Sequence, residues 1–182
     1  MRDHYSLVID DSILDQLGKI IDRPISLLIT DNLTIEGGRI FSGYFAFGIS
    51  GDEWVNISSD WGDTPKTYLD YWCLDIDITC NPDRLVRIST NNKPLAKKVA
   101  NIYLSNPIDR VTEIIIHAYG DRNVTESVHC DRSITFVGAN GAFFTLVTPT
   151  TIAGWMELVT EKASQAELLK TFHERKRIRP TE

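Results

Sequence analysis

The sequence predicts an α+β fold, in which a mostly antiparallel sheet is built from two related halves that are each closed by a helix. Three observations predict it: strand patterns recur in both halves at a nearly constant distance, a stretch with helical spacing follows each set of strands, and no linker rich in Gly, Ser or Pro divides the chain. We therefore expect a single compact domain over residues 1–182, with pseudo-repeat halves at about 17–103 and 104–178.

The repeat rests on matching landmarks. Pro24 and Pro107 each open an apolar run and are 83 residues apart, and the same distance separates Trp72 from Trp155. Between these landmarks, two apolar segments of the first half align without a gap on two of the second half, at an offset of 89 residues. A true duplication explains these matches, and a chance likeness between two aromatic hairpins is the alternative.

In the first half, a helix is predicted to precede the strands. Ser12 followed by Asp15 resembles a capping box, and apolar residues at helical spacing continue until shortly before Pro24. Strand patterns then occupy 25–30, about 39–49, 54–58, 74–80 and 85–89. A short helix is predicted to start at 91–94 and to close this half, with inward-facing Leu95, Val99, Ile102 and Tyr103.

The second half is predicted to repeat this plan. Its strand patterns lie near 110–118, 123–130, 133–138, 142–148 and 153–159. Asn140 and Gly141 between two apolar runs are the strongest hairpin signal of the chain, because both residue types tolerate positive φ. Ser164 and Glu167 predict the capped start of a final helix that continues to about Arg175.

Composition is typical of an ordinary folded protein. The chain has 182 residues, of which 42% are hydrophobic and 24% charged. We expect a cytoplasmic protein without a membrane segment, since acids interrupt the N-terminal stretch and no apolar run approaches the roughly 20 residues of a spanning helix. Three cysteines, an odd number, fit a reducing compartment.

Negative charge is concentrated in one segment. Between Asp52 and Asp77 there are seven acids and one base, Lys66, so this segment carries a net charge of −6, equal to that of the whole chain. Large aromatic residues are interleaved with these acids. The predicted binding residues are Asp60, Trp61, Asp63, Tyr68, Asp70, Asp75 and Asp77.

Acids interleaved with aromatic rings suit the recognition of a basic protein, because carboxylates steer and pair with Lys or Arg while rings supply buried contact area. The leading hypothesis is a non-enzymatic intracellular binding protein. Small size, acidity and the lack of catalytic motifs are also typical of bacterial immunity proteins or antitoxins that neutralise a toxin nuclease. The alternative is that the acids only keep the protein soluble and the rings cover a sheet edge.

Two further hypotheses remain. Asp75 and Asp77, two positions apart on a strand, place their carboxylates about 6.5–7 Å apart on one face, as in hydrolases that activate water. Trp61 and Tyr68 would then stack against a carbohydrate substrate. The third hypothesis is a structural or assembly subunit.

No cofactor, metal or catalytic residue is predicted. His129, Cys130 and Asp131 are consecutive, so on a strand they point to alternate faces and do not converge on one metal. The basic segment 170–179 is too small to predict nucleic-acid binding in a chain of net charge −6, but its docking on the acidic segment of a second copy would give a homodimer.

Overall fold

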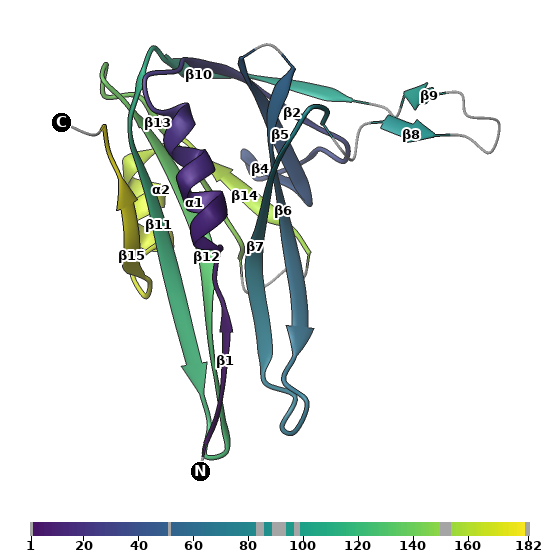
Figure 1. Ribbon diagram of the computed structural model, residues 1–182, viewed down its shortest axis with the longest axis vertical. Coiled ribbons are helices and arrows are strands. Elements are labelled where there is room, and N and C mark those ends of the chain that lie inside the picture. The colour runs from purple at the N-terminus through teal and green to yellow at the C-terminus, as the bar shows by residue number, and fades with distance from the viewer. Residues whose placement is uncertain are drawn as a thin grey trace.

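The computed structural model describes residues 2–50, 52–82, 86–88, 94–96, 99–149 and 154–180. It is mostly β, with 60% strand and 11% helix, and its strands form two large sheets. The predicted α+β class with helix-closed halves is therefore wrong. Figure 1 shows an elongated molecule in which long strands extend from the region where the two sheets meet.

The larger sheet has eight strands, in the order β15-β11-β12-β13-β14-β4-β3, with β1 paired parallel to β12. Both halves of the sequence contribute to it. Its strands are β1 (Asp3–Leu7), β3 (Thr34–Glu36), β4 (Arg39–Ser42), β11 (Val111–Arg122), β12 (Glu126–Gly138), β13 (Phe143–Val147), β14 (Met156–Val159) and β15 (His173–Ile178).

The smaller sheet has five strands in the order β10-β2-β5-β6-β7. They are β2 (Ile25–Thr30), β5 (Tyr44–Ser50), β6 (Glu53–Asp63), β7 (Asp70–Thr79) and β10 (Ala100–Ile108). Two short strands, β8 (Val86–Ile88) and β9 (Pro94–Ala96), pair with each other in a separate ladder.

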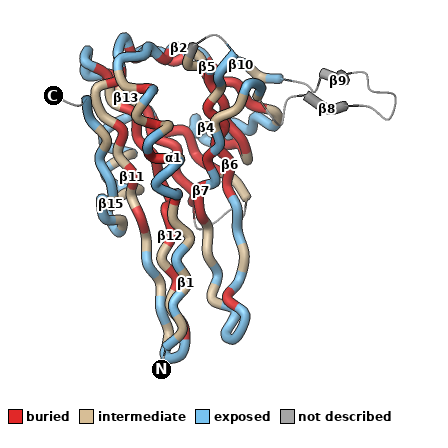
Figure 2. The backbone as a smooth tube through the Cα atoms, in the orientation of Figure 1, coloured by how far each residue is buried: buried red, intermediate tan, exposed pale blue. Residues whose placement is uncertain are grey.

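Apolar side chains from both sheets meet in one core. Phe47 of β5 contacts the rings of Phe136 and Phe144 edge-on, with centroids 5.2 and 6.2 Å away. The α1 helix (Asp11–Leu17) and the following 3-10 turn η1 (Gly18–Ile20) bury Leu14, Leu17 and Ile20 in the same core. Figure 2 shows that burial is concentrated where the sheets overlap, whereas the lower ends of the long strands are largely exposed.

The predicted closing helix of the first half is absent from the described residues that follow its start. Leu95 lies in β9, and Ile102 and Tyr103 lie in β10. Ile102 is buried while Tyr103 is 75% exposed, which is the alternation of a strand. Of the predicted start at 91–94, residues 91–93 lie outside the described residues and Pro94 lies in β9.

The predicted final helix is too long. The α2 helix (Lys162–Leu168) buries no residue, and its N-cap is Glu161 rather than Ser164. The segment that we expected to continue it becomes β15, which pairs with β11. Edge pairing satisfies the backbone groups of a highly charged segment that has no apolar face to bury.

The first helix is present, although its predicted capping box is not. Its N-cap is Asp10 instead of Ser12, and no side chain caps it. Neither helix is long and apolar enough to cross a membrane, a finding that covers the described residues.

Each half supplies four neighbouring antiparallel strands, β2-β5-β6-β7 and β11-β12-β13-β14. The predicted turn between β12 and β13 is confirmed: Gly141 has a φ of 75°, and the Gly138 N–H donates to the carbonyl oxygen of Ala142 at 2.8 Å. Common ancestry of the two halves stays a prediction.

Candidate functional site

The predicted binding residues all lie on one long hairpin. We call β6, β7 and the connecting residues 64–69 the acidic hairpin. Its ladder runs from the pair Trp54 and Thr79 to the pair Asp63 and Asp70. The loop is closed by Thr64, whose N–H donates to the Leu69 carbonyl at 3.0 Å and whose hydroxyl accepts from the Leu69 N–H at 2.9 Å.

All seven predicted residues are exposed. Trp61 is 54% exposed and Tyr68 74% exposed, so neither ring belongs to the core. Tyr68 also has a φ of 52°, in the left-handed region that non-glycine residues adopt infrequently. Two large rings are thus available to a partner on this hairpin.

The seven residues do not form one flat patch. Residues directly opposite each other in an antiparallel ladder share a face, and successive residues alternate. Trp61, Asp63 and Asp70 therefore lie on one face of the acidic hairpin. Asp60, Asp75 and Asp77 lie on the other face. A partner would have to contact both faces of the hairpin, or bind only the loop with Tyr68 and one of the two faces.

The hairpin's acids lack cationic partners among the residues that the structure describes. Asp60 and Asp77 each accept a hydrogen bond from the N–H of the next residue, at 2.9 and 2.8 Å. Asp75 accepts one from the Ser58 hydroxyl at 3.5 Å. The nearby base Lys66 binds Asp3 of β1 at 2.5 Å instead. The negative charge of the acidic hairpin is therefore left for solvent or a partner.

Asp63 and Asp70 face each other directly at the end of the ladder. The pKa of Asp63 is raised by a hydrogen bond shared with Asp70, by partial desolvation and by repulsion between the two carboxylates. Like charges in directly opposed positions destabilise a sheet. The pair therefore costs stability.

Replacing Asp63 with Asn should raise the melting temperature slightly at neutral pH, because it removes this repulsion. A raised pKa in the folded state means that the penalty is full above that pKa and disappears below the ordinary value of 3.8. The increase in melting temperature caused by D63N should thus become smaller as the pH is lowered. Thermal melts of D63N and of the control D52N, at the opposite end of β6, measure it; an unchanged or lower melting temperature for D63N would contradict the repulsion.

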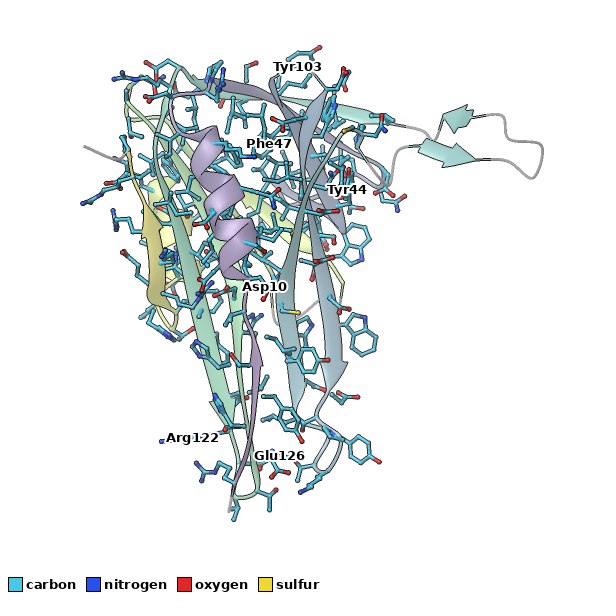
Figure 3. The ribbon with its side chains drawn as sticks, in the orientation of Figure 1. Asp10, Tyr44, Phe47, Tyr103, Arg122 and Glu126 are labelled. Carbon is cyan, nitrogen blue, oxygen red and sulfur yellow. The ribbon has the colours of Figure 1, made fainter. Side chains whose placement is uncertain are left out.

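The loop of the acidic hairpin is fastened to the end of the β11–β12 hairpin through Glu126, a residue that the sequence did not single out. Glu126 is fully buried. It accepts hydrogen bonds from the Thr64 hydroxyl at 2.6 Å, the Lys66 N–H at 3.1 Å and the Thr67 N–H at 2.8 Å. Tyr5 of β1 donates to it at 3.2 Å. Figure 3 shows Glu126 at the lower end of β12, between the two hairpin ends.

The described residues do not place Asp75 and Asp77 in a cleft, as the hydrolase hypothesis requires. Asp75 and Asp77 are exposed and share a face of β7, as predicted. Neither is a wall residue of the main cavities that the described residues form. The paired-Asp site stays a prediction.

Metal and thiol chemistry is equally unsupported in the described part of the chain. No group of three or more His, Cys, Asp or Glu side chains there converges as metal ligands. Cys130 is buried, and burial is the main cause that raises its pKa to about 11. Cys73 is also buried and free.

The basic C-terminal segment lies mainly on β15. Its residues 176–179 line a groove of about 780 Å³ beside α1 and η1, together with the bases Lys19 and Arg23 and the acids Asp15 and Asp22. Part of its charge is used internally, since Arg177 and Arg179 both pair with Glu113 at 2.5 and 2.7 Å. Docking of this groove on the acidic hairpin of a second copy stays a prediction.

A scan against protein-family models and searches of curated proteins and of solved structures found no match to this chain.

Proposed function

We propose that this chain is a non-enzymatic binding protein that holds a basic protein partner with the acidic hairpin. One observation carries the proposal: the acids of an exposed hairpin have no described cationic partner, and two of them oppose each other next to exposed rings. A basic side chain inserted between Asp63 and Asp70 would relieve their repulsion. Trp61 and Tyr68 would supply the apolar contact area at the centre of the interface.

The hairpin is preorganised for this role. The Glu126 hydrogen bonds tie its loop to a second hairpin, so binding would cost little ordering of the loop. Neutralisation of a toxin nuclease is the finer form of the proposal, because a nuclease surface that binds phosphates is itself basic. The three free thiols suit a reducing compartment, and we propose a cytoplasmic location.

Affinity capture tests the proposal. The immobilised chain, its charge-reversed form D63K/D70K and the control E36K/E167K would be exposed to an extract of the cells that carry the protein. The control changes the net charge equally but alters exposed acids of β3 and α2. We expect the chain and the control to retain a basic protein that salt releases and that D63K/D70K does not retain. Recovery of the same proteins by all three baits would contradict the proposal.

A further inference from the structure

Arg132 is a buried cation without a described acidic partner. Only 1% of the residue is exposed. Its Nε donates to the Thr148 hydroxyl at 3.1 Å and its Nη2 to the Thr148 carbonyl oxygen at 2.6 Å. No carboxylate of the described chain forms an ion pair with it. Buried guanidinium groups normally pair with an acid, because desolvating an unpaired charge is costly.

Aromatic rings surround this guanidinium and compensate only part of the cost. Its central carbon lies 5.3 Å from the ring centroids of Trp72, Tyr119 and Phe172. Cation–π contacts of this kind favour the charged form but are weaker than a direct ion pair. Burial nevertheless lowers the pKa of Arg132. The positive charge of Arg132 is therefore only partly compensated by the described residues.

Two cavities meet at Arg132. The smaller, of about 60 Å³, lies between β7 and the β11–β12 hairpin. Its wall includes Trp72 and two acids, Asp70 and Asp121, neither of which forms a described ion pair with Arg132. The indole Nε1 of Trp72 is buried without a hydrogen-bond partner. An unsatisfied donor thus lies in the ring that faces the Arg132 guanidinium, and native proteins leave few such groups unsatisfied.

The larger cavity, of about 250 Å³, has Arg132, Thr148 and Thr171 as polar wall residues, with apolar surface from Val147, Leu168 and Phe172. None of its described wall residues carries a carboxylate. Arg39 also lines it, but the Arg39 guanidinium is paired with Glu157, so Arg132 holds the uncompensated charge. An anionic head group and an apolar body are the ligand features that match these walls.

We propose that the larger cavity binds a small organic carboxylate, with its carboxylate on Arg132 and its apolar body against Phe172, Leu168 and Val147. Thr148 occupies Nε and one N–H of Nη2, and the remaining donors on Nη1 and Nη2 match the two oxygens of a carboxylate. A cavity of this size admits a ligand no larger than a small aromatic or short aliphatic acid. The site does not depend on the partner proposed for the acidic hairpin.

Calorimetric titration with benzoate, benzyl alcohol and inorganic phosphate tests the proposal. We expect saturable binding of benzoate at concentrations up to roughly 10 mM, at least tenfold weaker binding of benzyl alcohol, and no comparable binding of phosphate. Absence of saturable benzoate binding would overturn the proposal. Equal binding of the neutral alcohol, or of phosphate, would overturn the assignment of a carboxylate with an apolar body.

Two variants locate the site. Arg132→Met should abolish benzoate binding, but this buried change can also impair folding. Thr171→Trp, at an exposed wall position, keeps Arg132 and fills the cavity mouth, so it should weaken benzoate binding at least tenfold without unfolding the protein. Lys170→Trp, exposed in the same segment but outside the described wall, is the matched control and should bind normally. Unchanged binding by T171W would place benzoate elsewhere and overturn the proposal.

Discussion

Replacing Asp131 with Asn is expected to lower the free energy of unfolding by about 3–5 kcal/mol. Asp131 is fully buried, and Arg175 of β15 donates to it from Nε at 2.6 Å and from Nη2 at 2.5 Å. The N–H of Ile9, between β1 and α1, donates to the same carboxylate at 2.8 Å. One side chain therefore joins β12 to the C-terminal strand and to the N-terminal segment, and its neutralisation leaves Arg175 without its counter-charge.

Urea unfolding of D131N and of E113Q would measure this effect. Glu113 also binds two arginines, Arg177 and Arg179, but these pairs are more exposed, so E113Q should cost no more than about 1 kcal/mol. A loss of less than about 1 kcal/mol for D131N as well would show that the buried pair does not hold β15 and the N-terminal segment in place.

Replacing Glu126 with Gln is expected to release the loop of the acidic hairpin from the β11–β12 hairpin. Burial alone raises the pKa of Glu126, but hydrogen bonds from Thr64, Thr67 and the Lys66 N–H lower it to about 2. The donors of Thr64 and Thr67 converge on one carboxylate oxygen, Oε2. An amide in place of the carboxylate directs either its own N–H groups or a weaker acceptor at them.

The pH dependence follows from the lowered pKa of Glu126. Its stabilising contribution is fully present above the ordinary pKa of 4.5 and is lost as pH falls toward about 2. Amide hydrogen exchange in residues 64–69 should thus be much faster in E126Q than in the unmutated protein at pH 6, and the two should converge as pH approaches the lowered pKa. The control E53Q, at the far end of β6, should leave this exchange unchanged. If residues 64–69 exchanged equally slowly in E126Q and in the unmutated protein at pH 6, the result would contradict a role of Glu126 in holding this loop.

Strand positions could largely be predicted from the sequence because alternation is a local signal. The β2 strand begins and ends where the pattern predicted, and Gly141 forms the predicted turn. The predicted closing helix of the first half is wrong because Ile102 and Tyr103 fit a helical spacing, whereas Ile102 and Leu104 also alternate with exposed neighbours, as in a strand. Only the sheet partner β2 decides between the two readings, and that contact is not local.

The acidic hairpin was predictable because its residues are close together in sequence. Their split onto two faces follows from strand register, which links Asp63 to Asp70 but Asp60 to Cys73. Glu126 and Arg132 could not be found in this way. A single Glu or Arg carries no sequence signal. The contacts of Glu126 with Thr64 and of Arg132 with Trp72 join segments that lie far apart in the sequence.

The affinity of the captured basic partner for purified variants, measured by calorimetry at roughly 50 and 500 mM salt, tests the central claim most directly. At the lower salt concentration D63K/D70K should bind at least a hundredfold more weakly than the unmutated chain, and E36K/E167K should bind within about threefold of it, because only the first variant alters the acidic hairpin. Raising the salt concentration should reduce the difference in affinity between D63K/D70K and the unmutated chain. Equal weakening by both variants, or no weakening by either, would contradict recognition through the acidic hairpin.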